Sequence, residues 1–148
     1  MQLFVNDLTV IDFSYCCPQR GIVGESWIVD VLLDGSLNEM SMVLDFAVVK
    51  KQIKAIIDDA VDHKLLLPIN NKMIEFTDST ENQDHEFVDV YTERADYFLQ
   101  SPKCAFAKIA AKEINISSVT VHLTDIILLL TVVHIRQCQP HGSLLSPD

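Results

Sequence analysis

The sequence lacks most of the short motifs that identify common function classes. It has only four glycines in 148 residues. It contains no glycine-rich phosphate loop, no dinucleotide-binding glycine fingerprint and no Gly-x-Ser-x-Gly turn. Its longest apolar run, residues 126–133, is far shorter than the roughly 20 residues that span a bilayer. We therefore expect no membrane segment and interpret this run as a buried strand.

Positive charge is also scarce. The chain has 11 lysines and arginines against 21 aspartates and glutamates, which gives a formal net charge of -10. Without a basic patch, nucleic acid and anionic membranes would be repelled, so we expect neither as a partner. An anionic ligand would depend on a few cations: Arg20, Lys50, Lys51, Lys54 and Lys64.

Cysteine is too rare for a disulfide framework. There are four cysteines, and two of them, Cys16 and Cys17, are neighbours that seldom bridge to each other. The N-terminal residues have no basic region followed by an apolar stretch, so we predict no signal peptide. These features predict reduced thiols and a cytoplasmic protein.

The chain has enough apolar residues, 49%, for one folded domain, which we place at residues 1–135, with a loose tail at 136–148. Residues 3–15 and 27–33 predict a strand hairpin, because β-branched and aromatic residues partly alternate with polar ones. From Asp45, a good N-cap, apolar residues recur at helical spacing up to Asp62-His63.

The second half predicts more strands and one more helix. We expect strands at 73–77, 87–92 and 95–100, a polar acidic loop at 78–86, a helix at 102–114, and strands at 119–123 and 126–135. Strands paired before and after helices favour an α+β fold, with an antiparallel sheet and both helices on one face.

Residues 41–68 carry the most specific pattern. A Met-Val-x-Asp-Phe entry at residues 42–46 precedes a helix bearing Lys50, and the helix exits at Asp-His-x-x-Leu, residues 62–66. Upstream, Phe13-Ser14 and the segment from Gly24 through Trp27 into a Val-Asp-Val strand extend the pattern. This set resembles the 6-pyruvoyl- and 6-carboxy-tetrahydropterin synthase family.

The resemblance implies the tunnelling fold, in which ββ-α-α-ββ subunits assemble into oligomeric β-barrels and bind pterin- or purine-like rings at subunit interfaces. It also implies a zinc ion held by three histidines, a cysteine base and an Asp-His pair that relays protons. A glutamate near the end of the chain anchors the pterin ring in the family.

Several of these family residues are replaced. The first zinc histidine falls at Cys17, and the His-Gly-His element falls at Val23-Gly24-Glu25. Only Cys17 and Glu25 remain as zinc ligands, fewer than the three protein ligands usual for a catalytic zinc. The ring-anchoring glutamate falls at Leu123, and residues 138–142 only partly match the zinc motif. The chain resembles the degenerate half of a double-length relative.

Each candidate residue has a functional and a structural interpretation. Asp62 and His63 fit a proton relay, or a histidine that interacts favourably with a helix C-terminus. Cys17, near Arg20, fits a base or nucleophile, or one of two packed cysteines. Glu25 and Trp27 fit a substrate pocket, or a strand and its core. His122 and His134 are more typical of sheet histidines than of metal ligands.

Two functions follow from the resemblance. The first is a protein that converts or binds a dihydroneopterin-triphosphate-like pterin, on the queuosine or tetrahydrobiopterin pathway. Any catalysis would be carbon-oxygen or carbon-carbon lyase chemistry using Asp62, His63 and Cys17. The alternative is a catalytically inactive, zinc-free binding or assembly module. A homo-oligomer is implied in both cases, and the residues alone leave the choice open.

Overall fold

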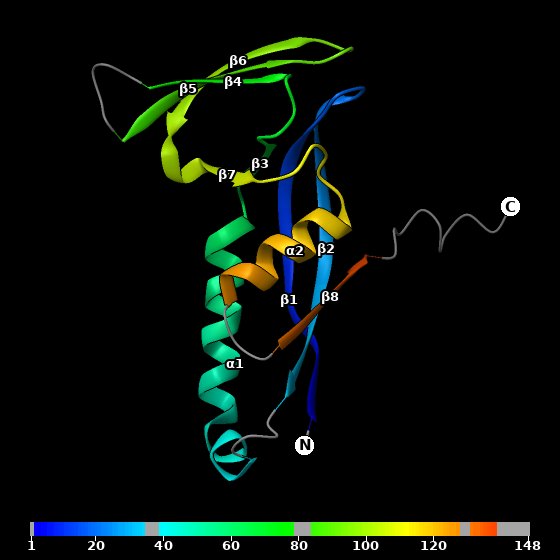
Figure 1. Ribbon diagram of the computed structural model, residues 1–148, viewed down its shortest axis with the longest axis vertical. Coiled ribbons are helices and arrows are strands. Elements are labelled where there is room, and N and C mark those ends of the chain that lie inside the picture. The colour runs from blue at the N-terminus through cyan, green and yellow to red at the C-terminus, as the bar shows by residue number, and fades with distance from the viewer. Residues whose placement is uncertain (1, 35–38, 79–83, 128–130, 139–148) are drawn as a thin grey trace, which may run out of the picture.

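A computed structural model describes residues 2–34, 39–78, 84–127 and 131–138. Figure 1 shows a long sheet with helices against it and a second sheet across one end. In chain order the elements are β1 (Gln2–Cys17), β2 (Gly21–Asp34), α1 (Glu39–Val61), β3 (Leu65–Pro68), β4 (Ile74–Asp78), β5 (His85–Tyr91), β6 (Asp96–Pro102), the 3-10 helix η1 (Lys103–Ala105), β7 (Phe106–Ile109), α2 (Ile116–Ile127) and β8 (Thr131–Gln137).

The main sheet has the strand order β7-β3-β1-β2-β8. Its centre is the predicted hairpin, in which Cys17 pairs with Gly21 and Phe13 pairs with Glu25. β8 joins β2 in an antiparallel register, whereas β3 pairs with β1, and β7 with β3, as parallel strands. The predicted α+β class is confirmed, and the parallel edge is a feature that the sequence did not indicate.

Both helices cover the same face of the main sheet. α1 buries Ile53, Ile57 and Val61 there, and α2 buries Val119, Leu123 and Ile127. In each helix these residues recur at every fourth position, which places them on one stripe. Full burial of each such side chain stabilises the fold by about 1.5–3 kcal/mol. This layer holds α1 against β1 and thereby fixes where α1 ends.

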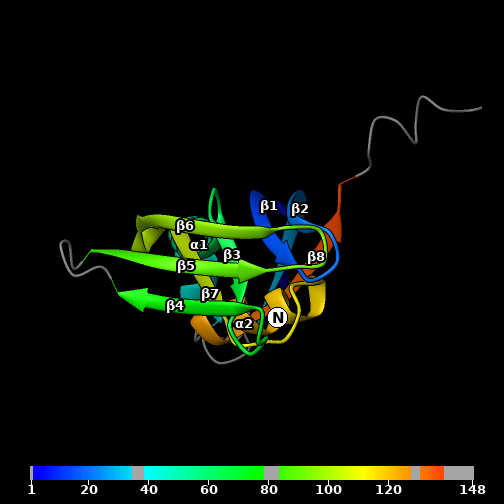
Figure 2. The same cartoon turned by 90° about the horizontal axis from the view of Figure 1, so that it is seen from above.

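The second sheet, with the order β4-β5-β6, lies across the hairpin tip (Figure 2). Its inner face packs Val88 and Val90 against Cys16 of the hairpin in a second core. β3 and β7 separate the two cores, because Leu66 and Ile109 belong to the first and Leu67 and Phe106 to the second. The strands predicted at 73–77, 87–92 and 95–100 are confirmed as this sheet. The ββ-α-α-ββ order that the resemblance implied does not include it.

The first helix begins earlier than predicted. α1 starts at Glu39, so Asp45 lies inside the helix and its predicted role as the N-cap is wrong. The predicted end is correct within a residue, since α1 stops at Val61. Leu65–Pro68 forms the expected extended segment.

The second helix was predicted in the wrong place. Pro102 ends β6, where it pairs with His85, and Phe106–Ile109 forms β7 beside β3. The helix is α2, where Val119–Leu123 and the start of the apolar run were predicted to be strands. Asn115 and Ser118 exchange hydrogen bonds at its start: the Asn115 N–H donates to Ser118 Oγ, 3.0 Å, and the Ser118 N–H to Asn115 Oδ1, 2.8 Å. This reciprocal cap, not Pro102, begins the helix.

At the C-terminal end, β8 continues to Gln137, two residues into the stretch that was predicted to be a tail. The remaining predicted tail, from residue 139, lies outside the described residues. In the described part of the chain, no helix combines the length and apolarity needed to cross a membrane.

Candidate functional site

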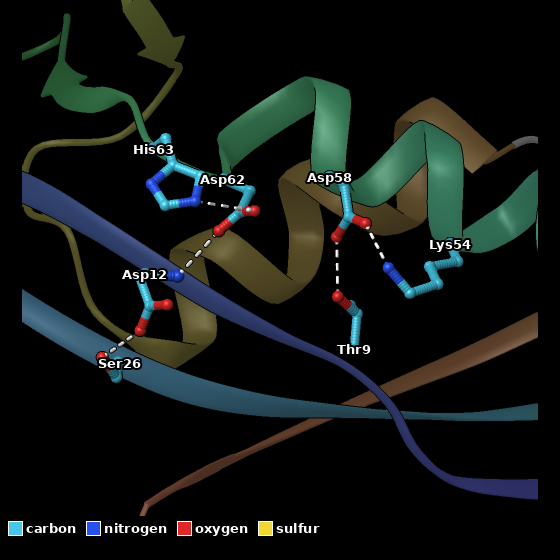
Figure 3. A network of polar contacts seen from close by, with 7 residues as sticks. All are labelled: Thr9, Asp12, Ser26, Lys54, Asp58, Asp62 and His63. Atoms are coloured by element: carbon cyan, nitrogen blue, oxygen red, sulfur yellow. Dashed lines mark hydrogen bonds and ion pairs between the residues drawn. The ribbon is translucent and has the colours of Figure 1, made fainter.

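The Asp62-His63 pair lies where α1 ends against β1 (Figure 3). Asp62 Oδ1 accepts a hydrogen bond from the Asp12 backbone N–H at 2.9 Å. Asp62 Oδ2 lies 3.5 Å from His63 Nε2. The carboxylate therefore bridges the sheet backbone and the imidazole, and it fixes where the ring lies relative to β1.

The backbone of His63 is anchored to β1, whereas its side chain is exposed. Its N–H donates to the Asp12 carbonyl at 2.7 Å, and its φ of 59° lies in the left-handed region. That region costs an L-residue about 1–2 kcal/mol. The His63 side chain is 80% exposed. A strained, anchored backbone thus presents an accessible imidazole next to a carboxylate, an arrangement that can accept and release a proton.

A shallow depression of about 400 Å³ lies beside this imidazole. It is lined by Asp12, Phe13, Ser14, His63, Lys64 and Leu65. The Ser14 N–H donates to the Lys64 carbonyl at 3.0 Å, which ties the two walls together. Lys64 supplies a cation to a hollow that is otherwise close to two carboxylates.

Asp12 and Ser26 were not predicted as part of this site. The Ser26 hydroxyl donates to Asp12 Oδ1. The Asp12 backbone N–H donates to Asp62 Oδ1, and its carbonyl accepts from the His63 N–H. The sequence signal for Asp12 was its position one residue before the Phe13-Ser14 motif. Its contact with Asp62, 50 positions away, depends on how α1 packs.

The two adjacent cysteines have opposite environments. Cys16 is fully buried in the second core, and this burial raises the pKa of its thiol to about 12. Cys17 is partly exposed. Desolvation raises the pKa of the Cys17 thiol, but hydrogen bonding at the Arg20 and Gln19 backbone and the Arg20 guanidinium outweigh it, so the net shift is downward. Cys17 Sγ also lies 3.6 Å from Gln19 Oε1. Of these two cysteines, Cys17 is the one with the properties of a reactive thiol.

Glu25 and Trp27 differ in accessibility. Glu25 is partly buried opposite Phe13. Trp27 is 4% exposed and packs edge-on against Phe13, with ring centroids 4.7 Å apart. Its indole Nε1–H has no hydrogen-bond partner among the described residues. In the single chain Trp27 is a core residue.

The residues present do not fit a zinc ion. The register puts Cys17 and Glu25 four residues apart along the hairpin, which separates their backbones by about 13 Å. Donor atoms bound to one zinc lie at most about 4.4 Å apart. Val23, between them, has no donor atom. No group of three or more potential ligands occurs within the described ranges.

His122 and His134 also do not form a pair. His122 lies on α2, not on a strand as predicted, and desolvation lowers its pKa while Asp125 partly opposes the shift. His134 is exposed on β8, between Val133 and Ile135, which are buried toward the helices. The two histidines therefore lie on opposite sides of the sheet. Leu123, the position that aligned with the ring-anchoring glutamate, is buried in α2.

Comparison with known proteins identifies the family. The model of the 6-pyruvoyl tetrahydropterin synthase family matches residues 16–123. The chain belongs to this family. A protein of Methanocaldococcus jannaschii named "Putative 6-carboxy-5,6,7,8-tetrahydropterin synthase" is 41% identical over 59 residues, which is 38% of this chain and 36% of that protein. The match to this relative thus spans about a third of its length.

Solved structures support the same fold. The 6-pyruvoyl tetrahydropterin synthase of Plasmodium vivax has a TM-score of 0.62 at 14% identity, over 93% of this chain and 98% of that one. The Plasmodium falciparum synthase gives a TM-score of 0.62 at 11% identity, with the same coverage. At these identities the likeness shows a shared fold.

Proposed function

We propose that this synthase-family protein binds a dihydroneopterin-triphosphate-like pterin without zinc. The observation that carries the proposal is the Asp62-His63 pair, held by two hydrogen bonds to the Asp12 backbone in a chain of this family. The adjoining depression of about 400 Å³ has a volume within the usual range of small-molecule sites, roughly 300–1,000 Å³.

The chemistry of the depression suits this ligand. His63 can exchange a proton with a ring or side-chain heteroatom, and Asp62 keeps the imidazole oriented. Lys64 provides positive charge for a triphosphate on a surface that is otherwise acidic. The depression is open, which is consistent with a site completed by another subunit. A cytoplasmic homo-oligomer is part of the proposal.

A lyase acting on the same pterin is the second candidate. The environment of Cys17 favours it, because a thiol with a lowered pKa beside Arg20 can serve as a base. His63 would then exchange a second proton. Cys17 would act as the base and not as a metal ligand, because its neighbours complete no metal site.

Calorimetric titration with dihydroneopterin triphosphate tests the binding proposal. His63→Asn is the informative variant, since asparagine tolerates the left-handed backbone that His63 adopts. We expect wild-type protein to bind and His63→Asn to bind about ten-fold more weakly, through loss of one hydrogen bond to a charged group. His122→Asn, which removes an imidazole from α2, is the control and should leave binding unchanged.

Equal affinity of wild type and His63→Asn, or no binding by the wild type, contradicts the proposal. Turnover assays and metal analysis of the same preparations separate the two candidates. If the metal-free protein has lyase activity and the Cys17→Ala variant loses it, the protein is a lyase that uses Cys17. If the protein binds dihydroneopterin triphosphate but does not convert it, the protein is the inactive binding module. Stoichiometric zinc that disappears in Cys17→Ala would contradict the zinc-free site.

A further inference from the structure

The second sheet has an outward surface that the pterin proposal does not use. Six residues on its three strands form what we call the acidic-aromatic face: Glu75, Phe87, Asp89, Tyr91, Asp96 and Phe98. Their side chains point away from the second core, because they alternate with the buried Val88 and Val90 and their cross-strand partners. Figure 2 shows this sheet spread across the end of the molecule.

Three large aromatic rings are exposed on this face. Phe98 is 69% exposed, Tyr91 41% and Phe87 39%. Tyr91 and Phe98 are in edge contact, with ring centroids 6.2 Å apart. Scattered exposed apolar residues are ordinary, but neighbouring aromatics on a hydrogen-bonded sheet form a preorganised apolar patch.

The carboxylates around the rings lack partners. Glu75 and Asp89 are directly opposite each other on β4 and β5, and Asp96 is opposite Tyr91. In the described part of the chain, none of the three side chains has an ion-pair or hydrogen-bond partner. Like charges at opposite positions of a strand pair are destabilising. Desolvation raises the pKa of Tyr91, and the charges of Asp89, Glu75 and Asp96 raise it further.

These properties define the chemistry of the occupant. Aromatic faces attract lysine ammonium and arginine guanidinium groups, and adjacent carboxylates pair with them. No outward position of the described strands β4, β5 and β6 is lysine or arginine. The six residues span about 10 Å by 13 Å, far less than the roughly 800 Å² that each partner buries in a stable complex.

We propose that the acidic-aromatic face binds a short lysine- or arginine-bearing segment of another protein. A second copy that docked through the same face is a poor occupant, because its Glu75, Asp89 and Asp96 would meet the like charges of the first copy. The small footprint indicates a weak, salt-sensitive and exchangeable contact.

NMR titration of the full chain at low salt tests this proposal. The probes are the octapeptides (Lys-Gly)4 and (Arg-Gly)4, with (Glu-Gly)4 as the opposite-charge control. We expect the basic peptides to shift amide signals of β5 and β6, and added salt to reverse the shifts. Phe98→Ser and the double variant Glu75→Gln/Asp96→Asn should each weaken binding by about two- to five-fold.

The matched control is Glu113→Gln/Asp125→Asn, which removes two exposed carboxylates beside α2 and should leave affinity unchanged. If the control variant loses as much affinity as the double test variant, the effect is one of net charge and the proposal is overturned. Equal binding of (Glu-Gly)4, or no binding of the basic peptides, would also overturn it. Dimerisation of the wild type that Phe98→Ser abolishes would assign the face to a second copy and also overturn it. Each variant's far-ultraviolet circular dichroism verifies that it folds.

Discussion

At the scale of single residues, Cys16 and Cys17 show how one position along a strand changes chemistry. Their side chains point to opposite faces of β1, so Cys16 enters the second core and Cys17 faces the Arg20 turn. The Arg20 guanidinium also donates to the Tyr15 hydroxyl at 2.7 Å, which holds it at the turn. The sequence identified the Cys17-Arg20 proximity, because the two residues are only three positions apart.

Replacing Arg20 should make Cys17 less reactive. In Arg20→Gln, loss of the guanidinium raises the pKa of the Cys17 thiol, so a smaller thiolate fraction is present at neutral pH. We expect the rate of Cys17 alkylation by iodoacetamide at pH 7 to fall and its midpoint to move to higher pH. Peptide mass spectrometry across pH 6–10 measures this. Lys51→Gln, which removes an exposed charge on α1, should leave the profile unchanged. An unchanged profile in Arg20→Gln would disprove the assignment.

At the scale of elements, β8 pairs with β2, and Arg136 of β8 adds ion pairs to Asp30 and Asp7 of the hairpin. Arg136 Nε donates to Asp30 Oδ2 at 2.9 Å, and the Asp7 N–H donates to Asp30 Oδ1 at 2.7 Å. Asp30 is 2% exposed. Its burial raises the pKa of the carboxyl, but hydrogen bonds and charge from Arg136, with the Asp7 amide, outweigh this and lower it.

Removing Arg136 should destabilise the fold in a pH-dependent way. Because the pKa of Asp30 is lower in the folded state, its stabilisation is present above the ordinary value of about 3.9 and is lost as the pH falls through the folded value. We expect Arg136→Met to cost about 2 kcal/mol at pH 7, since it leaves a buried carboxylate without its cation.

Urea unfolding at pH 7 and at pH 3 measures this difference. The gap between wild type and Arg136→Met should shrink at the lower pH, because the Asp30 carboxyl is then protonated in the unfolded state and the stabilisation that its lowered folded-state pKa provides is being lost. Arg94→Met, on the exposed turn between β5 and β6, should be neutral at both values. A gap of equal size at both pH values would rule out the ion pair as its source.

The elements also show where local sequence was sufficient. The hairpin and the end of α1 were predictable because alternation and helical periodicity there agree with local propensity. α2 was missed because its β-branched residues suggest strands, whereas the core selected the four-residue spacing of Val119, Leu123 and Ile127. Pro102 suits a helix start equally well, but pairing with His85 places it in a strand. In both places, contacts with residues far away in the sequence selected the structure over the local preference.

At the scale of the whole molecule, the open face of the main sheet suggests self-assembly. Opposite the helices, Phe4 is 58%, Val10 46% and Val132 60% exposed. Within the described residues, β7 and β8 are the edge strands of this sheet, and exposed edges favour pairing with another chain.

Mass measurement should therefore find an oligomer. Val132→Glu should raise the dissociation constant by about ten-fold or more, because it puts a charge on the apolar face. Val121→Glu is a matched control, since Val121 is 58% exposed but lies on α2. Analytical ultracentrifugation distinguishes the two variants. A wild-type protein that is strictly monomeric at high concentration would contradict the predicted barrel assembly.

Strands β3 and β7 lie between the two hydrophobic cores and contribute residues to both. One side of each strand belongs to the helix-covered core and the other to the core beneath the second sheet. β3 also begins directly after His63 and Lys64. We therefore expect a molecule that binds and orders the second sheet to restrict also the backbone at His63. Occupancy at one end of the protein should be measurable as slower amide exchange at the other.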